Sequence, residues 1–456
     1  MNGIIILVVY AFIMIAATIC LTKKEKNIER FCVGDRNINW LMSSLSIAAT
    51  WIWAPALFVS TEKAYLNGIV GLFWFLIPNI LCLIIFIPFA KMIRKQMPEG
   101  ITLSGYMMEK YSSKPVKGVY LFQLGALSIL STAVQLLAGS QILALVTDLP
   151  FFVVTILLAI IAYSYSQFSG IKASILTDSI QMCFMLVASI AFVIFALKGN
   201  GVESLFNGLS GVTGEYSSLL SEKGIELFFA FGLPTTVGLL SGPFGDQSFW
   251  QRAFSVKKKH IGKSFFVGAL LFGIVPLSMG IVGFIGAGNH YTIKDVSVIN
   301  FELISKMFPS WVVVPFLFMI ISGLLSTVDS NLCSISSLTT DIAKTKTLKW
   351  TKGSMILLLL LSIIIANIPN LTVTHLFLIY GTLRASTLFT TVLTLKKIKL
   401  SARGVTIGVI SSLLFGLPIF AYGTIYNISV FKTAGSLITV LASGLVALLV
   451  TKLEEI

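Results

Sequence analysis

The 456-residue chain has few charged residues: Asp, Glu, Lys and Arg make up 11% of it, against about 25% in an average soluble protein. Hydrophobic residues make up 56%, and apolar runs recur from residue 2 almost to the C-terminus. No stretch of soluble composition is long enough for a second core. The composition excludes a disordered chain and an ordinary soluble domain, and it predicts an all-α integral membrane protein.

The chain also lacks the usual signatures of metal, disulfide and nucleotide chemistry. Its five cysteines have no CxxC spacing and its three histidines stand singly. Walker, GxSxG and HExxH motifs are absent as well. We therefore expect no enzyme and no ATP-driven pump. The first apolar run has no cleavage site after it, so we expect it to be retained as a membrane span.

Thirteen runs of about 20 apolar residues have the length of a membrane span. They cover 2–22, 41–66, 68–91, 118–147, 150–168, 171–197, 226–247, 263–288, 311–341, 353–370, 374–396, 404–422 and 432–451. The net charge is +14, and 26 of the 33 Lys and Arg fall in loops on one side of this arrangement. The positive-inside rule then predicts a plasma-membrane protein with its N-terminus outside and its C-terminus in the cytoplasm. The expected partners are the bilayer and a small solute, with no nucleic acid and no obligatory protein partner.

The spans divide into two halves of five. We expect a leading helix and loop over 1–40, a first half over 41–197, an extracellular linker over 198–225, a second half over 226–396 and two C-terminal helices over 397–456. An odd number of spans per half makes the halves antiparallel, as in an inverted repeat. The first span of each half is interrupted, by Pro55 and by Gly238 with Ser241, Gly242 and Pro243. Matching interruptions indicate a transporter's central site; unrelated proline kinks are the alternative.

Oxygen atoms suited to a hard cation gather around the first interruption. Pro55 cannot donate a backbone hydrogen bond, so carbonyls of the preceding turn lose partners. Span 311–341 carries a glycine and two hydroxyls on one face. Together these oxygens form an uncharged shell suited to Na+, contributed by Ala49, Ile52, Gly323, Ser326 and Thr327. The alternative is that the hydroxyls bond back to their own helix.

Two charged residues fall inside predicted spans, where charge is costly and marks function by default. Asp178 lies in span 171–197, and its structural alternative is a pairing with Lys172. Arg384 lies in span 374–396. It either meets a carboxylate of the solute or has a structural role, bonded to carbonyls or to Asp246.

Aromatic residues near the interruptions are candidates for the solute site. Trp51, Trp53 and Trp74 could stack on a small planar solute, and Gln135 could supply amide hydrogen bonds. Gly242 at the second interruption belongs to the same candidate set. The alternative for the tryptophans is anchoring at the membrane interface.

Five segments resemble the solute:sodium symporter family in order and spacing over roughly residues 25–400. They are FCVGDR (31–36), the stretch 46–68 ending in AYLNG, SGIKA (169–173) with TD (177–178), DQSFWQR (246–252) and LSTVDS (325–330). The resemblance implies the LeuT fold, with helices 1 and 6 broken and a sodium ion between helices 1 and 8. It places that ion on the five oxygen-bearing residues named above, and a second sodium on Asp178 and Ser330.

Within the family, WIWA (51–54), GLFW (71–74) and DQSFW (246–250) look most like the urea-transporter branch. The resemblance implies a sodium-coupled symporter that imports a small organic solute by alternating access, urea or a similar neutral molecule being the first choice. The alternative solutes are a proline-like amino acid or a monocarboxylate, anchored by Arg384. A sodium-sensing membrane protein and a passive channel are alternatives of another class.

Overall fold

The computed structural model describes residues 3–342 and 347–455, and over these ranges the chain forms helices and no β-strand. The basic residues Lys344 and Lys346, counted above, lie outside the described part. The helices of the first half of the chain are α1 (Gly3–Leu21), α2 (Ile28–Val33), α3 (Trp40–Trp51), α4 (Ala54–Leu57), α5 (Val59–Gln96), α6 (Leu103–Tyr111), α7 (Lys114–Thr147), α8 (Phe151–Ser169), α9 (Ile171–Asn207) and α10 (Glu222–Leu227).

The second half continues from α10 through a π-helical turn into a further set of helices. They are η1 (Phe228–Gly232), α11 (Leu233–Leu240), α12 (Gly242–Gly245), α13 (Gln247–Ser255), α14 (Ile261–Gly288), α15 (Ile299–Met307), α16 (Val313–Ile342), α17 (Leu348–Ala366), α18 (Val373–Ala385), α19 (Leu388–Leu395), α20 (Ala402–Ser411), η5 (Ser412–Gly416), α21 (Leu417–Ile425) and α22 (Ser429–Glu455). Short 3-10 turns join some of them.

Twelve helical stretches in the described residues are long and apolar enough to cross a membrane. The predicted span 41–66 is not among them, because it is not one helix. α3 ends at Trp51, Ile52 and Trp53 are non-helical, and α4 resumes with Pro55 in its first turn. The predicted interruption at Pro55 is therefore present, and it shortens α3 to 12 residues.

A sharp turn at Gly68 separates the end of this broken helix from the rest of α5. Gly68 has φ +54°, and a Cβ there would lie 2.4 Å from the carbonyl oxygen of Leu209. Only glycine tolerates both the left-handed backbone and this close approach. The turn falls where the sequence divides span 41–66 from span 68–91.

The second interruption lies between α11 and α13. α11 ends at Leu240, α12 is a single turn, and Asp246 is extended with φ −116° before α13 begins. The break matches the predicted Ser241-Gly242-Pro243 position. However, α13 continues to Ser255 and is buried along its length, whereas the sequence placed residues 248–255 in a loop after the span 226–247.

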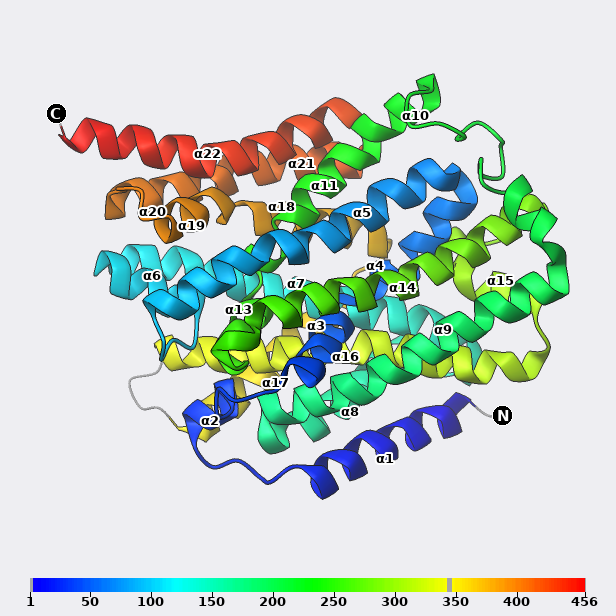
Figure 1. The fold of residues 1–456 in the computed structure, drawn as a ribbon, viewed down its shortest axis with the longest axis horizontal. Coiled ribbons are helices and arrows are strands. Elements are labelled where there is room, and N and C mark those ends of the chain that lie inside the picture. The colour runs from blue at the N-terminus through cyan, green and yellow to red at the C-terminus, as the bar shows by residue number, and fades with distance from the viewer. Residues whose placement is uncertain (1–2, 343–346, 456) are drawn as a thin grey trace.

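The broken helices are surrounded by long ones. α14 packs against α5, α9 and α3, and α16 packs against α7, α9 and α3. Figure 1 shows the long helices running along one common direction, with the two chain ends at opposite ends of the bundle. α9 extends to Asn207 with a kink at Gly201, whose φ is +80°, so the expected linker 198–225 consists of this kinked helix end and the irregular residues between Asn207 and α10.

Candidate functional site

The candidate sodium site lies where α3 ends beside α16. Ser326 Oγ donates to the carbonyl oxygen of Ala49 at 2.8 Å and lies 3.0 Å from that of Gly323. Thr327 Oγ1 donates to the carbonyl oxygen of Thr50 at 3.1 Å and lies 3.4 Å from that of Gly323. The structure therefore brings the predicted hydroxyls to the broken end of α3, and it adds the Thr50 carbonyl, which the sequence analysis did not include.

Gly323 allows α16 to approach the break. A Cβ at this position would lie 2.7 Å from Leu57 Cδ1 and 3.3 Å from the carbonyl oxygen of Ile52. The Ile52 carbonyl, the fifth predicted ligand, thus lies beside Gly323 of α16. Each hydroxyl has one proton and two lone pairs, so it can turn a lone pair toward a cation while the carbonyls remain in place.

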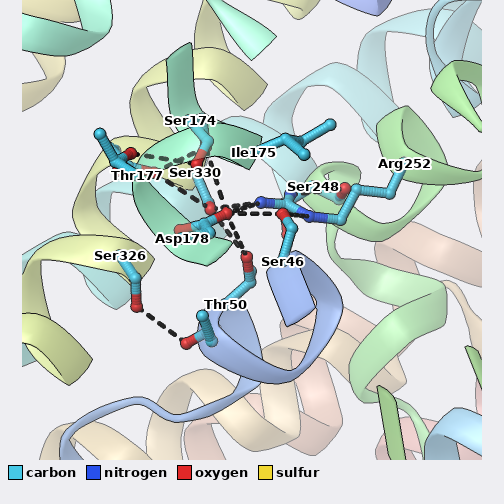
Figure 2. A network of polar contacts seen from close by, with 12 residues as sticks. Ser46, Thr50, Ser174, Ile175, Thr177, Asp178, Ser248, Arg252, Ser326 and Ser330 are labelled. Atoms are coloured by element: carbon cyan, nitrogen blue, oxygen red, sulfur yellow. Dashed lines mark hydrogen bonds and ion pairs between the residues drawn. The ribbon is translucent and has the colours of Figure 1, made fainter. Parts of the chain in front are cut away.

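Asp178 and Ser330 meet a guanidinium group in a second polar cluster (Figure 2). Arg252 Nη2 donates to Asp178 Oδ2 at 2.8 Å and to Ser330 Oγ at 2.7 Å. Ser46 Oγ donates to the same Asp178 oxygen at 2.6 Å, and Thr50 Oγ1 lies 2.9 Å from Ser330 Oγ. Arg252 is 1% exposed and Asp178 is fully buried. A positive charge of the protein therefore lies between the two predicted ligands of a second sodium.

The suggested pairing of Asp178 with Lys172 is wrong. Lys172 Nζ instead contacts Asp35 at 2.7 Å and Glu25 at 3.6 Å. The hydrogen bond from Lys172 lowers the pKa of the Asp35 carboxyl from its ordinary value. Six residues of α-helix turn a side chain about 120° away, so Lys172 and Asp178 lie on different faces of α9.

Asp329 adds a second carboxylate beside this cluster. It accepts hydrogen bonds from Ser174 Oγ at 2.7 Å and Thr177 Oγ1 at 3.2 Å. Arg252 forms its ion pair with Asp178 and not with Asp329, and Asp178 Oδ1 has no hydrogen-bond partner within the described ranges. The sequence analysis missed Arg252 as a partner because it assigned the residue to a loop; its position in the aromatic stretch FWQRAF was the available signal of burial.

A cluster of three aromatic side chains around Arg384 lies between the two helix breaks; we call Trp51, Trp53, Tyr380 and Arg384 the aromatic chamber. The Arg384 Cζ atom is 5.0 Å from the Trp51 ring, 5.2 Å from the Trp53 ring and 4.5 Å from the Tyr380 ring. Arg384 Nη2 contacts Asp246 Oδ2 at 3.4 Å, the partner that the sequence suggested. Tyr380 was not predicted, although it precedes Arg384 by one helical turn.

The other predicted solute residues are divided by the structure. Gly242 lies against the chamber, because a Cβ there would be 2.4 Å from Trp51 Cη2. Gln135 Oε1 accepts from the backbone N–H of Ala54 at 2.7 Å and its Nε2 donates to Ser131, so this side chain supports the start of α4. Trp74 is not grouped with the other tryptophans: its ring contacts are Phe73 and Phe228.

Comparison with known proteins now identifies the family. A model described as the sodium:solute symporter family matches residues 31–412. The chain belongs to this family. Members of this family are transporters and not enzymes, and so is the structural neighbour described in the next paragraph.

Two curated relatives and one solved structure give the range of similarity. The chain is 26% identical over 284 residues to a probable urea active transporter 2 of Schizosaccharomyces pombe, with 59% of this chain and 42% of that protein aligned. It therefore spans less than half of that transporter. The chain is also 25% identical over 484 residues to a sodium/pantothenate symporter of Haemophilus influenzae. That alignment covers 99% of this chain and 97% of the symporter. A Na+-coupled sialic acid symporter superposes with a TM-score of 0.77 at 16% identity over 98% of both chains, which confirms the LeuT fold.

Proposed function

We propose that this protein is a sodium-coupled secondary active symporter that imports a small organic solute by alternating access. One observation carries the proposal: two hydroxyls of α16 meet the carbonyls of Ala49, Thr50 and Gly323 at the break, and the Ile52 carbonyl lies beside Gly323. An uncharged oxygen shell of this kind suits Na+. Bound sodium would hold α3 against α16, which couples the ion to the adjacent chamber.

The sodium gradient supplies the driving force in this proposal. One positive charge moving inward gains about 2.3 kcal/mol per 100 mV, enough for roughly 50-fold accumulation of a neutral solute. The two halves 41–197 and 226–396 would act as an inverted repeat around the sodium and solute sites. Arg252 neutralises Asp178 at the second cluster, so the sodium ion at the break is the one that this proposal requires.

The size of the solute follows from its surroundings. The chamber is walled by Trp51, Trp53 and Tyr380, whose faces suit a small planar molecule. Sugars, with many donors and acceptors to satisfy, fit such walls poorly. Relatives named for urea and for pantothenate support two classes of solute, a neutral amide-like molecule and a carboxylate.

Uptake into proteoliposomes tests the function. Purified protein should accumulate at least one labelled solute above its external concentration when a sodium gradient is imposed, and should not do so with potassium or choline on both sides. A passive channel would only equilibrate the solute. A sodium sensor would bind the ion without moving any solute, so either result contradicts symport.

A further inference from the structure

The aromatic chamber contains more unpaired donors than its walls can use. Four buried donor groups have no hydrogen-bond partner in the part of the chain that the structure describes: Arg384 Nε, Arg384 Nη1, Trp53 Nε1 and the Tyr380 hydroxyl. Arg384 and Trp53 are each 2% exposed and Tyr380 is fully buried. Buried polar groups are normally paired, so donors left free at one place indicate a ligand that accepts hydrogen bonds.

These donors lie close to one another. The Arg384 Cζ atom is 4.5 Å from the Tyr380 ring centre and 5.2 Å from the Trp53 ring centre, and the two rings are 4.9 Å apart. The unpaired donors of all three side chains therefore belong to one small region of the bundle. The two helix breaks also meet here, because Gly242 of the second break lies against Trp51 of the first.

Asp246 leaves most of the guanidinium available. Its Oδ2 contacts only Arg384 Nη2, at 3.4 Å, while its Oδ1 accepts from the backbone N–H and the hydroxyl of Ser248. A planar guanidinium offers five N–H donors in a fixed fork. Since Asp246 makes one long contact with this fork, a second acceptor can bind the remaining donors.

Unpaired acceptors are scarce beside these donors. One of them, Asn79 Oδ1, is on the residue whose carbonyl oxygen accepts from Trp51 Nε1 at 3.1 Å. Urea offers four N–H donors and a single oxygen, so binding it would leave several of its own donors without partners. A carboxylate has only acceptors, and its planar pair of oxygens matches the guanidinium fork.

We infer that the transported solute is a small monocarboxylate whose carboxylate binds Arg384, Trp53 and Tyr380 in the aromatic chamber. The inference rests on the proposed symport function and narrows it to one chemical class. The methyl or short alkyl part of such a solute would pack on the faces of Trp51 and Trp53. If one sodium ion accompanies each monocarboxylate, the two charges cancel and the transport cycle moves no net charge into the cell.

Thermal unfolding of the purified full-length protein tests the solute class, because a ligand that binds the folded state raises Tm. The probes are acetate, propionate, lactate and pyruvate, each beside its amide, together with urea, in NaCl and in KCl. We expect at least one carboxylate to raise Tm in NaCl more than in KCl. The corresponding amide and urea should raise it less at the same concentration.

Substitutions in the chamber then connect this effect to Arg384. Arg384→Gln should weaken the apparent affinity for the carboxylate about 10- to 100-fold, since it removes charge-assisted hydrogen bonds. Arg384→Lys, which keeps the charge but loses the fork, should recover only part of it. Tyr380→Phe should weaken it several-fold. The matched controls Arg403→Gln and Tyr422→Phe alter exposed residues outside the chamber and should leave the affinity unchanged.

The outcomes separate the two proposals. If NaCl alone raises Tm but no carboxylate adds to it, or if an amide or urea adds more, the monocarboxylate inference is wrong and sodium binding stands. Full carboxylate affinity in Arg384→Gln also overturns the inference. If NaCl and KCl act alike, the symport proposal itself fails. Should Arg384→Gln not yield folded protein, the double variant Asp246→Asn with Arg384→Gln removes both buried charges and serves in its place.

Discussion

Ser326 and Thr327 are consecutive residues of α16 whose hydroxyls donate to consecutive carbonyls of α3, those of Ala49 and Thr50. The Ala49 carbonyl also accepts from the Ile52 N–H, and the Ala54 N–H, which would reach the Thr50 carbonyl in a regular helix, binds Gln135 instead. This arrangement thus depends on the break of α3 at Ile52 and on two hydroxyls of α16. At the scale of single residues, the candidate sodium site consists of a few oxygen atoms.

Replacing both hydroxyls tests the sodium site directly. Ser326→Ala with Thr327→Ala removes two of the five proposed oxygen ligands, so stimulation of solute uptake by sodium should disappear while the protein still inserts into the membrane. Each lost hydrogen bond should cost about 1 kcal/mol of stability. Uptake measured against sodium concentration checks this, and an unchanged sodium dependence would exclude the site.

Gly323→Ala tests the close approach of α16 to the break. The new methyl group would lie 2.7 Å from Leu57 Cδ1 and 3.2 Å from Ile52 Cγ2, and overpacking of this kind costs about 1–3 kcal/mol. We expect sodium affinity to fall about tenfold or more. Gly353→Ala is the matched control, because a Cβ there meets nothing within 4 Å. Equal sodium affinity in the two variants would contradict the role of Gly323.

Part of the site could be predicted from the sequence because its members are close along the chain. Gly323, Ser326 and Thr327 share a helix face by spacing alone, and Pro55 marks the break. Arg252 could not be paired with Asp178 in this way, since the two are 74 positions apart and only the fold brings α13 beside α9. Trp74 was misgrouped for the same reason: closeness to a break along the chain does not give the direction of a side chain.

Arg252 connects four helices at the scale of secondary-structure elements. From α13 it binds Asp178 of α9, Ser46 of α3 and Ser330 of α16. We expect these contacts, drawn in Figure 2, to change when the broken helices move relative to their surroundings in an alternating-access cycle. We call this set of contacts the four-helix junction.

Arg252→Gln should therefore weaken the contacts that hold α13, α9, α3 and α16 together in the four-helix junction. Removing one member of a buried ion pair costs about 3–5 kcal/mol, because the other charge is left uncompensated. We expect Cys333, which is fully buried one turn beyond Asp329 on α16, to react faster with a small thiol reagent. Alkylation of Cys333 followed by mass spectrometry measures this, in a chain with Cys20 and Cys183 replaced by Ser.

Two comparisons make the junction experiment decisive. Arg403→Gln removes an exposed arginine and should leave the alkylation rate unchanged. Arg252→Gln combined with Asp178→Asn removes both charges and should recover part of the lost stability. A Cys333 rate in Arg252→Gln equal to that of the unmodified chain would show that this ion pair does not hold the helices together.

At the scale of the whole molecule, the hydrophobic pattern predicted most of the long helices, since a membrane span needs about 20 apolar residues wherever it lies. It failed where helices are short or buried in protein. α4, α12 and α13 are four, four and nine residues long, far shorter than the run of apolar residues that marks a membrane span. Figure 1 shows the two chain ends at opposite ends of the bundle, and the predicted placement of the termini on opposite sides of the membrane stays a prediction.

The orientation of the molecule in the membrane is set by its basic loops. In the predicted arrangement of spans, 26 of the 33 Lys and Arg fall in loops on the side of the C-terminus, so the positive-inside rule predicts that this side faces the cytoplasm. Alkaline phosphatase fused after Asp148, in the connection between α7 and α8, should therefore be active outside the cell, whereas a fusion after Lys257 should be inactive. Green fluorescent protein shows the reverse dependence, because it fluoresces only when it folds in the cytoplasm. Active phosphatase at Lys257 together with fluorescence at Asp148 would show that the orientation is the reverse of the predicted one. The sodium gradient would then drive the solute in from the opposite end of the transporter.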